Sequence, residues 1–284
     1  MALEDWVDFW PSRVSGAVFA ASLALLFVGK LVLTAALLAV RARLPASAFK
    51  PSKSKKGAAA SAGDDDGANL VLDPNLVWFA LHALANAVVC GYAWDDTVHV
   101  LAHPAAAFRP SENEGHAIVM ATHVFHALFF DLDAADMLHH GVSVGIVGSM
   151  GYLVRWGALL HAIDFFICGL PGGLDYAMLA AAKAGALPGG KITAKRVNLW
   201  LQVGVRWPGI LLVIYNGLAC KLNGAHPGAA AVGWAPLLTV ALLHGWNGLY
   251  YAQRVVGNAY VAEHVLRHGG EGGGGAAKRG KKLE

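Results

Sequence analysis

Thirteen histidines stand out in this chain, because most of them lie in or beside apolar stretches. Three of them, His116, His123 and His126, are separated by seven and three residues, which puts them on one face of a helix. An imidazole titrates near neutral pH, so a histidine beside a carboxylate can take a proton from an amine or a hydroxyl. The pattern indicates either general acid–base chemistry or buried hydrogen bonding between helices.

The strongest candidate base is the adjacent pair His139 and His140, which opens an apolar stretch after an acidic turn. Asp136 precedes the pair by three and four residues, so on a helix its carboxylate could orient either imidazole. Acyl transfer to an amine or a hydroxyl needs such a base for the acceptor's proton and a proton donor for the leaving thiolate. We expect His139 and His140 to be catalytic and Asp136 to bind the substrate.

Further polar groups follow in the later apolar stretches. His161 and Asp164 are three residues apart, and Asp175 would share their face if the helix ran straight. Arg206 is a natural counter-charge for a buried aspartate or for an anionic ligand. We expect Asp164 to be catalytic, and we expect five further residues to bind the substrate: His161, Asp175, Arg206, His244 and Asn247.

A structural role for these groups is the alternative, since polar side chains also join helices in bundles without catalysis. Arg206 would then only pair with a buried aspartate. A metal site is a second alternative, because His99 and His103 have a spacing that can share a helical face. These two fall in a loop predicted to lie across the membrane from His139. We therefore expect no metal ion and no resident cofactor.

The composition indicates that membrane helices position these groups. Of the 284 residues, 56% are hydrophobic and 14% are charged, whereas a soluble domain carries about 25% charged residues. A membrane helix needs about 20 mostly apolar residues. Stretches near this length cover residues 14–40, 70–94, 115–132, 137–154, 156–182, 197–220 and 233–252. The sequence therefore predicts an all-α integral membrane protein, a bundle of about seven transmembrane helices.

Two features refine this bundle. Pro171-Gly172-Gly173 removes a hydrogen-bond donor and loosens the backbone within the fifth stretch, so we expect that helix to be broken there. Outside the predicted helices, sixteen lysines and arginines fall on one side and four on the other. By the positive-inside rule, the N-terminus is lumenal and the C-terminus cytosolic. The third and fourth stretches are short, so one of them could be re-entrant.

The chain divides into four parts. Residues 1–44 hold the N-terminal segment and the first helix, and residues 45–69 predict a flexible cytosolic linker. Residues 70–260 form the bundle, and residues 261–284 predict a flexible basic cytosolic tail. Lys281 and Lys282, the fourth and third residues from the C-terminus, resemble the dilysine retrieval signal of endoplasmic reticulum membrane proteins. We therefore expect a multipass protein of that membrane.

Several of these motifs resemble the TLC-domain family of multipass membrane proteins, which includes the TRAM, Lag and CLN proteins. The motifs are His139-His140 after an acidic turn, the stretch 155–164 (RWGALLHAID) and the stretch 243–251 (LHGWNGLYY). The resemblance covers roughly residues 70–260 and implies a divergent member. Its best-understood members are ceramide synthases, which transfer a fatty acyl group from acyl-CoA to a sphingoid amine.

By position, the resemblance implies that His139 and His140 act as the functional histidine pair of that family. The family's adjacent His-Asp is split here into His161 and Asp164. The implied function is action on lipids in the endoplasmic reticulum, by acyl transfer from acyl-CoA as co-substrate to a lipid amine or hydroxyl. The alternative is a non-enzymatic lipid-binding protein with a polar intramembrane cavity. Membrane lipids are the expected partners and nucleic acid is not; a homodimer is left open.

Overall fold

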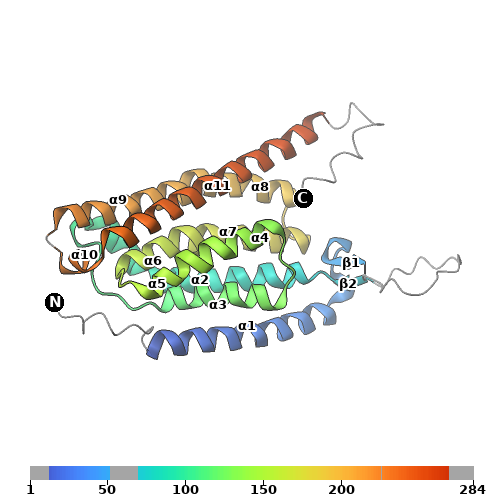
Figure 1. Cartoon of the computed structure of the whole chain (residues 1–284). Helices are drawn as coiled ribbons and strands as arrows, with labels where there is room; N and C mark the ends of the chain where they lie inside the picture. The colour runs from blue at the N-terminus through green and yellow to red at the C-terminus, as the bar shows by residue number, and fades with distance from the viewer. Residues whose placement is uncertain (1–12, 52–69, 225, 269–284) are drawn as a thin grey trace, which may run out of the picture.

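The computed structural model describes residues 13–51, 70–224 and 226–268, which are almost entirely helical. Consecutive helices join end to end, so the described chain forms seven long helical rods (Figure 1). The rods are α1 (Arg13–Ala39); α2 (Pro74–Ala102); α3 (Glu114–Phe129); α4 (Ala134–His139), η5 (His140–Gly148) and α5 (Ser149–Leu153); α6 (Ala158–Asp164), η6 (Phe165–Gly169) and α7 (Leu170–Lys183); α8 (Gly190–Leu201), η7 (Gln202–Arg206) and α9 (Trp207–Asn223); and α11 (Trp234–His268).

The segments η5, η6 and η7, which lie inside the composite rods, are π-helical.

Other short elements close the two ends of the bundle. Three of them are single 3₁₀ turns: η2 (Arg41–Arg43), η3 (Ala46–Ala48) and η4 (Pro104–Ala106). At one end, the strand end, β1 (Phe49–Pro51) pairs antiparallel with β2 (Leu70–Leu72). At the other, the Arg109 end, the loop after α2 meets α10 (Pro227–Ala231) and the turn before α6. The rods run lengthwise between these ends (Figure 1).

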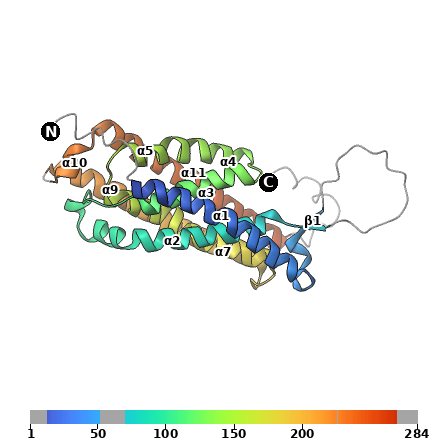
Figure 2. The same cartoon turned by 90° about the horizontal axis from the view of Figure 1, so that it is seen from below.

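Two apolar cores hold the rods together. In the first, Leu26 of α1 packs near Val77 and Trp78 of α2 and Phe125 of α3, and Figure 2 shows α1 lying along the outside of this group. The second core joins the Arg109 end of α6, α9 and α11. Its buried side chains include Phe108, Trp156, Leu159, Ile210 and Leu237.

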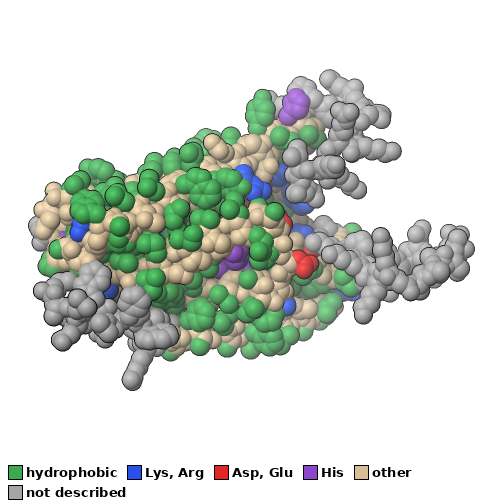
Figure 3. Space-filling model, in the orientation of Figure 1, with side chains coloured by type: hydrophobic (Ala, Val, Ile, Leu, Met, Phe, Trp, Pro, Cys, Tyr) green, Lys and Arg blue, Asp and Glu red, His purple; other side chains and the backbone are tan. Residues whose placement is uncertain are grey.

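Four helical segments are long and apolar enough to cross a membrane: Gly16–Ala39, Pro74–Ala102, Ala158–Lys183 and Gly190–Asn223. Figure 3 shows hydrophobic side chains spread over the visible side of the bundle, with few charged groups among them. The prediction of an all-α protein with membrane-length helices is confirmed. Within the described ranges, four helices meet these criteria, against the seven that the sequence predicts.

The predicted break at Pro171-Gly172-Gly173 is wrong, because the rod remains helical through these residues. Pro171 cannot donate a backbone hydrogen bond. The preceding segment η6 adapts by switching to the π pattern, in which the N–H of Leu170 bonds to the carbonyl of Phe165. The glycines serve packing instead: a Cβ on Gly172 would lie 2.9 Å from Asn86 Nδ2 of α2.

Three further boundaries differ from the predictions. Residues 46–51 of the predicted linker form η3 and β1, whereas residues 52–69 lie outside the described residues. The predicted flexible tail begins too early at residue 261, because α11 continues to His268; residues 269–284, including the dilysine pair, are not described. His99 lies in the last turn of α2 and not in a loop, since that helix ends at Ala102.

Candidate functional site

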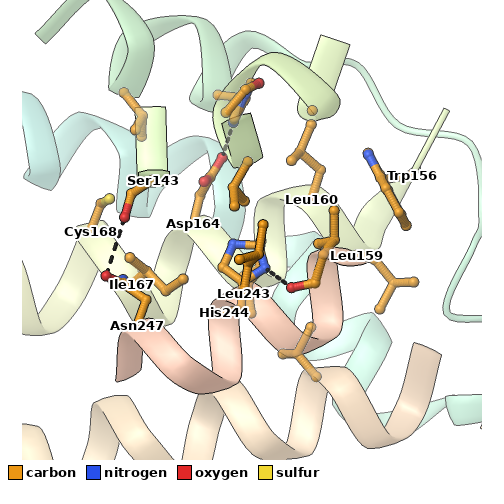
Figure 4. A pocket seen from close by; sticks show the side chains of 18 of the residues that line it. Ser143, Trp156, Leu159, Leu160, Asp164, Ile167, Cys168, Leu243, His244 and Asn247 are labelled. Carbon is orange, nitrogen blue, oxygen red and sulfur yellow. Dashed lines mark hydrogen bonds and ion pairs between the residues drawn. The ribbon is translucent and has the colours of Figure 1, made fainter. Parts of the chain in front are cut away.

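A cavity of about 90 Å³ lies among α3, the three composite rods and α11. This volume is several times the ~10–15 Å³ that one water molecule needs. Figure 4 shows that Trp156, Leu159 and Leu160 line one part of the cavity, while Ser143 and Asn247 line another. The cavity therefore has an apolar end, toward Arg109, and a polar end deeper in the bundle.

A buried histidine–aspartate pair lies on the cavity wall. His116 Nδ1 of α3 is 2.9 Å from Asp164 Oδ2 of α6, and both residues line the cavity. The Nε2–H of His116 donates to the carbonyl of Gly148, at 2.9 Å, so only Nδ1 faces the carboxylate. One proton is then shared between imidazole and carboxylate, and the pair is net neutral wherever that proton lies. Such a pair places a proton on the wall of an apolar site.

His139, the first residue of the predicted catalytic pair, also lines the cavity. Its Nε2 is 3.2 Å from Nε2 of His123. The Nδ1–H of His123 donates to the carbonyl of Val119, so its Nε2 must accept, and His139 donates to it through Nε2–H. The remaining nitrogen of His139, Nδ1, carries a lone pair, is buried and has no hydrogen-bond partner among the described residues.

The opposite wall comes from α11, which supplies His244 and Asn247. The Nδ1–H of His244 donates to the carbonyl of Val240 at 3.0 Å, which leaves its Nε2 with a lone pair. The hydroxyl of Ser143 in η5 donates to Asn247 Oδ1 at 3.2 Å. Figure 4 shows these side chains and Asp164 around one space. The cavity thus offers two imidazole lone pairs and one shared proton.

His140 and Asp136 do not behave as predicted. His140 donates from Nδ1 to the backbone carbonyl of Asp136 at 2.7 Å, and its ring lies beside His126, with ring centres 5.2 Å apart, outside the cavity lining. The Asp136 carboxylate accepts from the N–H of Asp133 instead, in a capping box at the start of α4. Local capping therefore occupies the carboxylate that the sequence assigned to the histidines.

His161 belongs to a separate network at the Arg109 end. Its Nδ1–H donates to Asp96 Oδ2 at 2.8 Å, and its Nε2 accepts from the N–H of Gly115 at 3.2 Å. Asp96 also accepts from Arg109, at 2.7 Å, and from the hydroxyl of Ser111. We call Asp96, Arg109, Ser111 and His161 the Asp96 brace. The serine and the aspartate both meet the same histidine nitrogen, so the brace is not a nucleophilic triad, in which they meet opposite nitrogens.

Arg206 and Asp175 also lie away from the cavity lining. Arg206 donates to Gln202 Oε1 at 2.8 Å, and no ion pair joins it to Asp164 or Asp175 in the described part of the chain. Asp175 interacts with Arg206 electrostatically from α7. Asp164 is not the aspartate that Arg206 meets, because His116 holds that carboxylate.

A cluster of imidazoles adjoins the polar end of the cavity. His82 of α2 lies edge-on to His123, with ring centres 5.9 Å apart, and stacks on Tyr176. His123 in turn lies 5.5 Å from the ring of His140. Within the described ranges, no group of three or more histidine, cysteine, aspartate or glutamate side chains is arranged to hold a metal ion.

The structure therefore brings four of the nine predicted site residues to one cavity: His139, Asp164, His244 and Asn247. Among the cavity residues that the predicted site left out, three have side chains that make polar contacts at the site: His116, His123 and Ser143. The spacing of His116 and His123 on one helical face was the signal that could have placed them in the site. Nothing in the sequence distinguishes Ser143 from other small polar residues.

No known protein family, no characterised protein and no solved structure matches this chain.

Proposed function

We propose that this chain is a multipass membrane protein that takes the aliphatic chain of a lipid into its cavity and acts on that lipid. The observation that carries the proposal is the cavity itself. It is lined mostly by apolar side chains, yet Asp164, His139 and His244 lie on its walls. An apolar pocket with a few convergent polar groups is the usual form of a site for an amphipathic small molecule.

The outer surface supports a membrane location. Large apolar side chains are widely exposed along the rods, among them Trp200, Leu222, Leu242 and Tyr260. A soluble monomer rarely exposes contiguous apolar patches of this extent. The charge asymmetry supports a lumenal N-terminus and a cytosolic C-terminus, and the TLC-like motifs support the endoplasmic reticulum. The proposal includes the seven crossings and the divergent TLC-like membership that the motifs imply.

Acyl transfer from acyl-CoA to a lipid amine or hydroxyl is the reaction that the polar wall fits. His139 Nδ1 or His244 Nε2 accepts the proton of the acceptor as its nitrogen or oxygen attacks the thioester carbonyl. That proton then passes to the departing thiolate, so the histidine is regenerated. The His116–Asp164 pair, which shares a proton, adds no net charge to the pocket.

Lipid binding without catalysis is the second candidate, and one observation favours it. Among the described residues, neither His139 nor His244 has a carboxylate partner, because Asp164 is held by His116. A histidine base is normally oriented and stabilised by a third group. A cavity that only holds a lipid needs no such group.

The test reconstitutes the full chain in lipid nanodiscs with labelled palmitoyl-CoA and a panel of long-chain amines and hydroxyl acceptors. Lipids that co-purify are identified by mass spectrometry. Ala241→Trp fills the cavity, since Ala241 lines it. Leu242→Trp is the matched control, because the neighbouring Leu242 on α11 is 72% exposed and points away.

Product that is lost in Ala241→Trp and retained in Leu242→Trp supports acyl transfer. Absence of product, with a co-purified lipid that only Ala241→Trp displaces, supports the binding protein. If both variants retain the lipids and the activity of the unmodified chain, the cavity is not the site and both candidates are wrong.

A further inference from the structure

We propose that the buried indole of Trp156 closes the apolar end of the cavity and thereby sets the length of the lipid chain that the cavity accepts. This inference rests on the proposed function and deepens it. Trp156 is 4% exposed and lines the cavity where the turn between α5 and α6 meets the second apolar core.

The indole is held rigidly. Its Nε1–H donates to the carbonyl of Met150 at 2.8 Å, and its backbone N–H donates to the carbonyl of Val154. The next residue, Gly157, has a φ of 59° and lies directly against the backbone of Arg109, where a side chain would clash. A side chain fixed at both ring and backbone can act as a stop, since it cannot swing aside to admit further methylene groups.

The polarity of the wall gives the direction in which a chain lies. Around Trp156, the lining is aliphatic and includes Leu160 and Leu237. Ser143 and Asn247 lie toward the other end, where they are hydrogen-bonded to each other. A polar headgroup is costly to bury at the apolar end and finds partners at the polar end. The chain terminus therefore points toward Trp156.

The length of the pocket follows from α11. Leu237 lies at the apolar end and Asn247 at the polar end, and ten helical residues rise about 15 Å. This is roughly half of the ~30 Å thickness of a bilayer's hydrocarbon core. A pocket of that length, closed by a rigid ring, distinguishes chains that differ by a few methylene groups.

The test measures which fatty acids the full chain binds in nanodiscs when it is offered an equimolar mixture of saturated acids from lauric to behenic. Bound acids are extracted and quantified by mass spectrometry. Trp156→Leu should shift the preferred chain to longer acids by about two methylene groups or more, because a smaller side chain frees space at the closed end. Leu160→Trp should shift it to shorter acids.

Trp246→Leu is the matched control for the tryptophan change, because Trp246 is 43% exposed on the outside of α11. It should leave the chain-length distribution unaltered. If Trp156→Leu fails to fold, Leu160→Trp tests the same end of the cavity in the opposite direction. Binding of fatty acids with the same length distribution in all variants overturns the role of Trp156 and leaves the proposed function intact. If the unmodified chain binds no fatty acid, the proposed function fails and this inference fails with it.

Discussion

Two buried histidine–aspartate pairs lie on neighbouring turns of α6, and they have opposite surroundings. His161 meets Asp96 at 2.8 Å in the Asp96 brace, and Asp164 meets His116 at 2.9 Å on the cavity wall. In the brace, the carboxylate also holds Arg109 and Ser111. In the cavity pair, the carboxylate has a histidine as its one ion-pair partner among the described residues.

The difference shows that residue type and burial alone do not distinguish a structural histidine–aspartate pair from one that could take part in chemistry. Both pairs are built from the same side chains and are almost inaccessible from outside. What differs is the number of donors on the carboxylate and the presence of the cavity. Asp96 accepts from Arg109, Ser111 and His161, and none of these four residues lines the cavity. Asp164 accepts from His116, and both of these residues line the cavity.

The largest effect expected is loss of the brace. Asp96→Ala leaves Arg109 and His161 without their shared carboxylate, and breaking a buried charged network costs about 3–5 kcal/mol. The midpoint of thermal or denaturant unfolding in detergent measures this cost. A variant that unfolds like the original chain would show that the brace does not stabilise the fold. The structural role that the comparison assigns to the brace would then be wrong.

The second prediction separates the adjacent histidines. If acyl transfer occurs, His139→Ala should lower the initial rate about 100-fold, because a positioned base contributes at least that much. His140→Ala should lower it far less, since His140 does not line the cavity. The rates are measured with labelled acyl-CoA in nanodiscs, with the circular dichroism of each variant as the control for folding. Equal losses for the two variants would contradict the assignment.

The third prediction concerns the cavity pair. Asp164→Asn removes the shared proton, but leaves an amide N–H that can donate to Nδ1 of His116, so we expect a loss of about 1–3 kcal/mol in stability. A double-mutant cycle with His116→Gln should give a coupling energy of about 0.5–3 kcal/mol. The cycle between His116→Gln and Asp96→Asn is the control and should be additive. Strong coupling there would mean that the two networks act as one.

The smallest effect is expected at the surface. Arg196 and Glu263 form an ion pair of 3.0 Å near the strand end, with side chains 58% and 39% exposed. Solvent screening reduces such a pair to about 0–1 kcal/mol. Glu263→Ala is therefore the reference for Asp96→Ala: both substitutions remove the carboxylate that an arginine contacts, and the loss of stability can be compared directly. If Glu263→Ala lowered the stability as much as Asp96→Ala does, burial would not explain the cost of losing the Asp96 carboxylate.

The rods were predictable from the sequence, because the apolar stretches are local. All seven predicted stretches overlap a helical rod, although α2 and α11 extend beyond their predicted ends. The shared face of His116 and His123 was also predictable, since helical spacing fixes it. The break at Pro171 was a wrong prediction, because a π-helical turn can absorb the missing donor without ending the helix.

Partners between rods were not predictable. The spacing of His161 and Asp164 suggested one unit, yet they point to different neighbours, Asp96 of α2 and His116 of α3. That outcome depends on which helices pack against α6, which no local pattern encodes. The prediction for Asp136 was wrong for the opposite reason. Its carboxylate is engaged locally, in the capping box of α4, and not by a histidine.

The π-helical segment η6 has a consequence for the register of its rod. Phe165–Gly169 separates Asp164, which faces the cavity, from Gly172, which packs against Asn86. If the same residues wound as ordinary α-helical turns, the extra residue that the π turn absorbs would rotate one half of the rod against the other by about 100°. With the glycine face anchored on α2, the carboxylate would turn out of the pocket while every helix remained in place.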